Sequence, residues 1–83
     1  MLVEELFKKH DVECPEWLKG KFLEDDWNDS EYSSEGNSHK WVLKTPMKHL
    51  ELLFTGEEYL LTAYVDGMEY MLEWSTEDTI TLF

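Results

Sequence analysis

Five runs in the second half of the chain are rich in leucine, aromatic and β-branched residues and are bounded by turn formers. Runs of this length and composition predict β-strands. Because short connections join them, neighbouring strands are expected to pair as an antiparallel meander. The predicted strands cover residues 39–44, 49–54, 58–65, 68–75 and 79–83.

Asp66-Gly67 is the clearest turn signal in the chain, because a two-residue Asp-Gly connection favours a type I′ hairpin. Side chains alternate across a strand, so the turn also predicts which residues share a face. On this basis we expect one apolar face built from the pairs Val65 and Met68, Ala63 and Tyr70, Leu61 and Leu72, and Tyr59 and Trp74. Trp41 is expected in the core of the same sheet.

The first 23 residues have a helical rather than a strand pattern. Residues 2–10 place apolar side chains at helical spacing, with acids early and bases late, which suits the helix dipole. Pro15 can begin a second helical turn, although Gly20 weakens that prediction. The predicted fold is α+β in a single domain: helical residues 1–23 pack on an antiparallel meander of four to five strands in 39–83, and residues 24–38 form an acidic loop or edge hairpin.

Charge is the feature that most restricts function. The 83 residues include 19 Asp and Glu against 7 Lys and no Arg, for a formal net charge of -12. Binding to nucleic acid needs cationic side chains to displace counterions, so direct nucleic acid binding is not expected. Anionic membrane surfaces would repel the protein as well. The favoured partner is a basic protein, although high negative charge also simply keeps proteins soluble.

Catalytic and metal-binding patterns are weak. Cys14 and His10 lie close in sequence, but nothing nearby suggests an oxyanion hole. One cysteine and three scattered histidines do not make a zinc site. A calcium loop beginning at Asp26 would need glycine and glutamate where Glu31 and Asn37 stand. We therefore predict a protein that is not an enzyme and carries no cofactor or metal.

The location inferred from the sequence is the cytoplasm. Cys14 cannot form an intramolecular disulfide, and small secreted domains usually depend on several. Acids stand near the N-terminus where a signal peptide would carry Lys or Arg. No apolar run approaches the length needed to span a bilayer.

Residues 24–35 give the sharpest functional signal, because aromatic residues stand among many acids. An aromatic anchor surrounded by charge is typical of a binding hot spot. The alternative is a solvated loop in which Trp27 folds back onto the sheet. The predicted protein-binding residues are Glu24, Asp25, Asp26, Trp27, Asp29, Glu31, Tyr32 and Glu35. Glu51, Glu69 and Glu73 offer a second acidic face.

Length, net charge, the helix-then-sheet layout and the segment 24–31 together resemble small acidic phage-encoded inhibitors of the DNA-mimic type. These include uracil-DNA glycosylase inhibitors and anti-defence proteins. The resemblance is one of class and rests on no motif. It implies an inhibitor, acting in the host cytoplasm, that blocks a basic nucleic-acid-binding enzyme or defence complex by presenting a DNA-like acidic surface. The alternatives are an immunity protein that neutralises a basic toxin such as a nuclease, and a non-inhibitory regulatory subunit.

Overall fold

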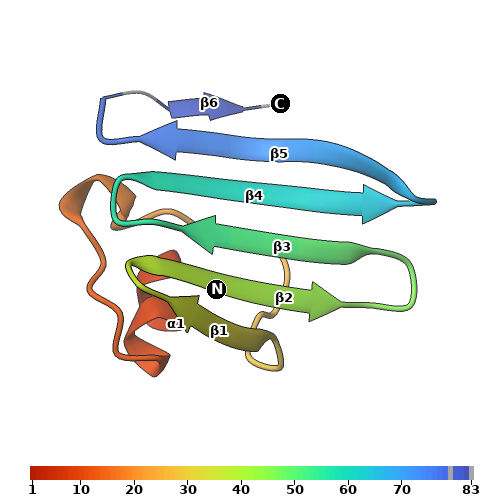
Figure 1. The fold of residues 1–83 in the computed structure, drawn as a ribbon, viewed down its shortest axis with the longest axis horizontal. Coiled ribbons are helices and arrows are strands. Elements are labelled where there is room, and N and C mark those ends of the chain that lie inside the picture. The colour runs from red at the N-terminus through yellow and green to blue at the C-terminus, as the bar shows by residue number, and fades with distance from the viewer. Residues whose placement is uncertain (79, 83) are drawn as a thin grey trace.

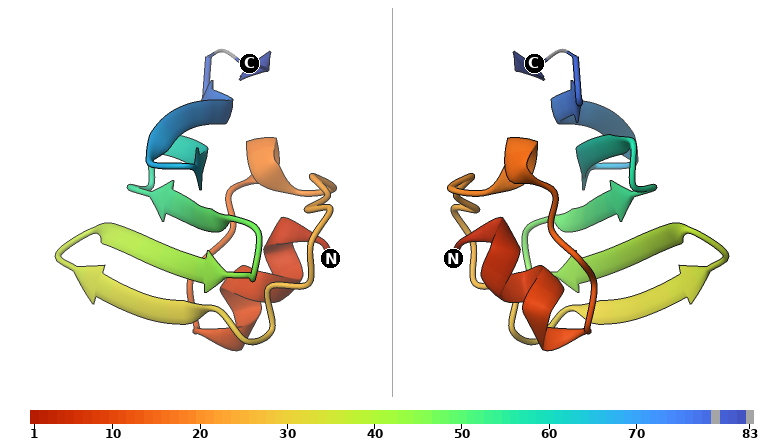
Figure 2. Two further views of the ribbon diagram at one scale, coloured as in Figure 1. Left: turned by 90° about the vertical axis from the view of Figure 1, so that its right-hand side faces the viewer. Right: turned by 90° about the vertical axis from the view of Figure 1, so that its left-hand side faces the viewer.

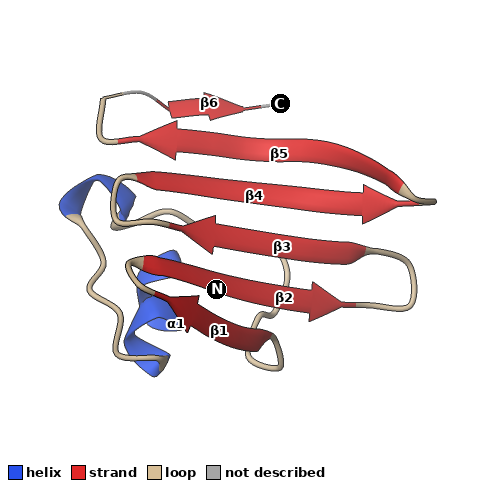
Figure 3. Ribbon diagram, viewed as in Figure 1, coloured by secondary structure: helices blue, strands red, loops and turns tan. Residues whose placement is uncertain are grey.

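The protein is an antiparallel sheet covered on one face by its N-terminal segment (Figures 1 and 3). The structure, a computed structural model, describes residues 1–78 and 80–82. Within this part of the chain each strand pairs with the next one along the sequence, in the order β1 to β6. The strands are β1 (Glu31–Glu35), β2 (Ser38–Lys44), β3 (His49–Phe54), β4 (Glu58–Val65), β5 (Met68–Thr76) and β6 (Ile80–Leu82).

The predicted strand count of four to five is wrong, because the described sheet has six strands. The additional strand is β1, which lies inside the segment predicted as a loop or edge hairpin. Its sequence, Glu-Tyr-Ser-Ser-Glu, lacks the apolar alternation of a half-buried strand. This segment is a strand because it pairs with β2 across the two-residue turn at Gly36, and its own sequence does not predict that pairing. Thr79 and Phe83, at the ends of the last predicted strand, lie outside the described residues.

The N-terminal segment is only partly helical. Helix α1 (Val3–Lys9) follows the predicted helix closely, and the Glu5 carboxylate accepts a hydrogen bond from the Leu2 backbone N–H at 3.2 Å. The second helical turn is reduced to η1 (Glu16–Leu18), a single 3₁₀ turn. Gly20 ends it with a φ of 86°, a conformation that glycine adopts without strain.

The β4–β5 hairpin begins in the predicted register and then leaves it. Val65 pairs with Met68 and Ala63 with Tyr70, as the Asp66-Gly67 turn predicts. A bulge between Leu61 and Thr62 then shifts the pairing by one residue. The predicted pairs Leu61 with Leu72 and Tyr59 with Trp74 are therefore wrong: Leu61 pairs with Glu73, Leu60 with Trp74, and Tyr59 with Ser75.

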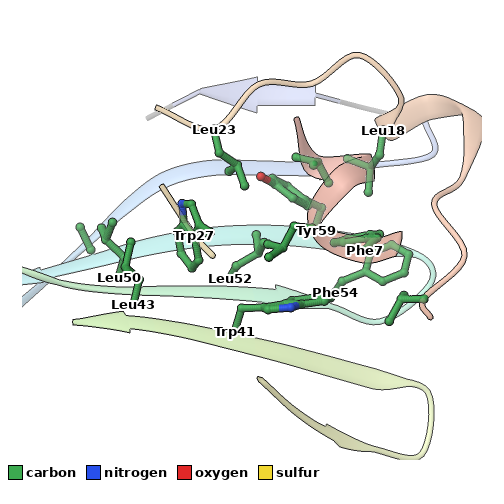
Figure 4. Close-up of a cluster of buried hydrophobic side chains, with 14 residues drawn as sticks. Phe7, Leu18, Leu23, Trp27, Trp41, Leu43, Leu50, Leu52, Phe54 and Tyr59 are labelled. Carbon is green, nitrogen blue, oxygen red and sulfur yellow. The ribbon is translucent and has the colours of Figure 1, made fainter. Parts of the chain in front are cut away.

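The core lies between α1 and the inner face of the sheet, which we define as the face covered by the N-terminal segment (Figures 2 and 4). Phe7 of α1 stacks on Trp41 of β2 with ring centroids 4.8 Å apart, and it also contacts Phe54. The prediction that Trp41 is a core residue is thus confirmed. Trp74 is half-buried and shares the opposite, outer face with Leu60, because the bulge reverses the alternation of β5.

Candidate protein-binding surface

The acidic segment, residues 24–35, begins as a loop in the inner layer and ends as the edge strand β1. Residues 24–30 form a loop that runs from beside α1 into β1 (Figure 2). Two local contacts shape this loop. The Asp26 carboxylate accepts a hydrogen bond from the Asn28 N–H at 3.0 Å, and the Trp27 carbonyl accepts one from the Ser30 hydroxyl at 2.7 Å. The loop therefore has a defined path across its most acidic part.

Trp27 is a core residue and not an exposed anchor. Its side chain is 1% exposed and lies among Leu23, Leu50 and Leu52 on the inner face (Figure 4). The structure does not present it as the exposed anchor that the sequence predicts, because a buried indole has no free surface to offer. The alternative interpretation, in which Trp27 folds back onto the sheet, is the one that the structure shows.

Tyr32 is also largely engaged within the protein. Its ring stacks on His10 at a centroid distance of 4.2 Å, and its hydroxyl lies 2.8 Å from His39 Nδ1. Burial, with a smaller effect of Lys9, lowers the pKa of His10. A neutral imidazole suits this aromatic setting, because burial disfavours the charged form. Tyr32 thus packs β1 against the inner layer, and the acids Glu31 and Glu35 lie on the opposite face of β1.

Five of the eight predicted residues are exposed and follow one another along the loop and β1, and we call them the acidic rim. The group consists of Glu24, Asp26, Asp29, Glu31 and Glu35. Within the described part of the chain, none of these five carboxylates makes an ion pair. Asp25 differs, since its Oδ2 lies 3.4 Å from Lys48 Nζ. Glu31 and Glu35 share the outer face of β1, and the usual rise of a strand places their Cα atoms about 13 Å apart.

The second predicted acidic face does not exist as a unit. Glu51 and Glu69 lie on the outer face of the sheet, whereas the bulge turns Glu73 to the inner face. Glu73 there forms an ion pair with Lys21, which also lies over the Tyr59 ring. A shift of one residue in register is enough to move a side chain to the other face.

Glu51 is the centre of a polar network rather than a free carboxylate. Lys40 Nζ and His49 Nε2 both lie 3.4 Å from its Oε1, and the Tyr64 hydroxyl donates to its Oε2 at 3.1 Å. Burial, the hydrogen bond to Glu51 and the nearby carboxylates raise the pKa of Tyr64 to about 12. The Glu51 carboxylate is therefore largely engaged by groups of the same face and is not free for a partner.

The arrangement around Cys14 does not favour nucleophilic chemistry. Burial and the neighbouring Glu4 carboxylate raise the pKa of the Cys14 thiol, whereas a reactive cysteine needs a lowered pKa. Its sulfur lies 3.7 Å from the Pro15 carbonyl. Among the described residues, no group of three or more His, Cys, Asp or Glu is placed to hold a metal ion.

The structure also shows a surface that the sequence pattern missed. Four apolar side chains at the tip of the β4–β5 hairpin were expected on the apolar face of the sheet, yet they are exposed, and Met71 beside them is exposed as well. We call this group the hairpin patch: Val65 (36% exposed), Met68 (61%), Tyr70 (49%), Met71 (40%) and Leu72 (37%). Alternation indicates which face a residue occupies, but not whether another element covers it.

Comparison with known proteins gives no relative from which a function can be transferred. No known protein family matches this chain, and no curated protein sequence and no solved structure shows significant similarity to it. No helix in the described part of the chain is both long enough and apolar enough to span a membrane.

Proposed function

We propose that this protein binds a basic protein and blocks its nucleic-acid-binding surface by presenting a DNA-like acidic surface. The observation that carries the proposal is the acidic rim, whose five exposed carboxylates have no ion-pair partner in the described part of the chain. Unpaired surface charge of one sign attracts an oppositely charged partner and speeds its association. The proposed place of action is the cytoplasm of the producing cell or of a phage host.

The amount of charge is of the right order for a competitor of DNA. The longest extent of the molecule is 34 Å, and it carries a net charge of -12. Duplex DNA carries one charge per roughly 1.7 Å of axis, or about 20 charges over the same length. The whole molecule therefore carries more than half of the charge of an equal length of duplex.

Competition with duplex DNA tests the proposal. The partner is first captured from lysate with the purified protein and identified. Its binding to this protein is then measured with and without duplex DNA, over a range of salt concentrations. We expect the two ligands to exclude each other and the association rate to fall as salt rises. A partner that holds DNA and this protein at the same time would contradict the proposal.

A charge-matched pair of variants then locates the surface. Replacing Asp26→Asn, Asp29→Asn and Glu31→Gln should slow association at least several-fold and weaken its salt dependence. The control variant removes the same number of charges at exposed positions outside the rim, by Glu57→Gln, Glu58→Gln and Glu77→Gln. Equal effects of the two variants would mean that only net charge matters and that the rim is not the interface.

A further inference from the structure

The tip of the β4–β5 hairpin extends beyond the N-terminal segment that covers the rest of the inner face (Figure 1). Val65, Met68 and Tyr70 of the hairpin patch are consequently open to solvent on the same face that elsewhere builds the core, whereas Met71 pairs with Thr62 on the outer face. Ala63, Val65, Tyr70, Met71 and Leu72 line a groove of about 650 Å³ there, with Lys48 and Glu69 at its border. Contiguous apolar surface of this kind marks an interaction site in soluble proteins.

The backbone beside the patch also has an open edge in the part of the chain that the structure describes. The described residues of β6 pair with Glu73, Trp74 and Ser75 of β5. No described residue pairs with the segment from Met68 to Leu72 on its side away from β4. An open strand edge next to an apolar face can receive an extended segment from another molecule.

Carboxylates surround this apolar surface and indicate the charge of its occupant. A second groove, of about 280 Å³, adjoins the first at Leu72 and Lys48. Phe22 and Leu61 contribute apolar surface to it, and Glu24, Asp25 and Glu73 lie at its border. Of these three carboxylates, Glu73 is already paired with Lys21, and Glu24 makes no ion pair in the described part of the chain. Lys48 is the one cation that lines either groove in the described structure, and Asp25 offsets its charge at 3.4 Å. Asp66 adds negative charge at the hairpin tip, and Glu69 lies beside it on the outer face.

We propose that the hairpin patch binds an extended apolar segment flanked by Lys or Arg in a partner protein. This inference rests on the proposed function, because it supplies the apolar anchor for the partner that the acidic rim attracts. Apolar side chains of the partner would enter the groove while its cations meet Glu24 and Asp66. A second copy of this chain is a poorer occupant, because each copy carries a net charge of -12. Such an anchor acts mainly on the dissociation rate, whereas the rim acts on association.

Defined peptides test this inference without the natural partner. Three eight-residue probes alternate Lys with Leu, Lys with Ser, and Glu with Leu, and their binding is measured by isothermal titration at low and moderate salt. We expect the Lys–Leu peptide to bind at least tenfold more tightly than the other two. Equal binding of the Lys–Leu and Lys–Ser peptides would overturn the apolar role of the patch. Equal binding of the Lys–Leu and Glu–Leu peptides would overturn its charge preference.

Matched variants assign the binding to the patch. Met68→Gln with Met71→Gln should remove the preference for Lys–Leu. The control, Met47→Gln with Leu53→Gln, changes side chains that are 87% and 37% exposed outside the patch, and it should keep that preference. Urea unfolding checks that both variants fold. If the first variant still prefers the Lys–Leu peptide, the inference is overturned. The proposed function would still stand or fall by the competition with DNA. The protein could instead dimerise as its concentration rises. If Met68→Gln with Met71→Gln abolished that dimerisation, the patch would be assigned to a second copy of the chain and the inference would be overturned.

Discussion

At the scale of single residues, Trp27 shows how an acidic loop is fastened to an apolar core. The indole is fully buried, whereas its neighbours Asp26 and Asn28 are exposed. The Trp27 carbonyl also accepts hydrogen bonds from both the backbone N–H and the hydroxyl of Ser30. Trp27 thus holds the loop while adjacent carboxylates remain in solvent, which gives the rim a fixed position relative to the sheet.

Trp27→Ala should accordingly lower the free energy of unfolding by about 3–5 kcal/mol, because it removes a large buried side chain and leaves a cavity. Phe22→Ala is the control, since the Phe22 side chain is 64% exposed and its loss should cost less than about 1 kcal/mol. Urea titration of both variants gives the comparison. Similar losses in the two variants would mean that the indole is not buried in solution.

At the scale of elements, the bulge in the β4–β5 hairpin decides which side chains reach the core. Leu72 occupies the extra position in β5, so Glu73 and Ser75 face inward and Trp74 faces outward. The inward Glu73 pairs with Lys21 and ties the N-terminal segment to β5. A bulge that redirects side chains in this way is a structural feature rather than a defect.

Leu72→Ala should lower the free energy of unfolding by less than about 1 kcal/mol, because the Leu72 side chain is 37% exposed. Leu52→Ala changes the same side chain at a fully buried position of β3 and should cost about 2–5 kcal/mol. Chemical denaturation of the two variants distinguishes the bulged register from an unbroken one. In an unbroken register Leu72 would pair with Leu61, and its loss would cost as much as that of Leu52.

At the scale of the whole molecule, negative charge opposes folding while it favours a basic partner. The seven Lys cannot offset the 19 acids, and four of them are already engaged in ion pairs. Like charges repel one another more strongly in the compact state than in the unfolded chain. The same charge therefore costs stability and speeds association.

Adding salt should raise the stability of the protein by screening this repulsion. Between low salt and about 0.5 M NaCl we expect a gain of about 1 kcal/mol, which for a domain of this size is a rise in Tm of about 4–8 °C. Differential scanning calorimetry measures the rise. The variant with Glu57→Gln, Glu58→Gln and Glu77→Gln is three charges less negative and should gain less. A Tm that does not change with salt would show that self-repulsion is unimportant.

The sequence by itself determined the features that depend on a few neighbouring residues. The helix near the N-terminus, the strands β2 to β5, the turn at Asp66-Gly67 and the first pairs of its hairpin all follow from local periodicity and turn geometry. The acids of the rim were also visible, because a charged side chain is almost never fully buried unless it is paired. Five of the eight residues predicted for binding are exposed for this reason and make no ion pair in the described part of the chain.

Only the tertiary structure decided the features that depend on distant partners. β1 is a strand because β2 pairs with it, and Trp27 is buried because the inner face offers it a place among leucines. The bulge moved Glu73 inward and Leu72 out of its predicted pair. The hairpin patch is exposed because the N-terminal segment does not extend over the hairpin tip. Alternation specifies the face of a sheet on which a side chain lies, whereas burial depends on what packs against that face.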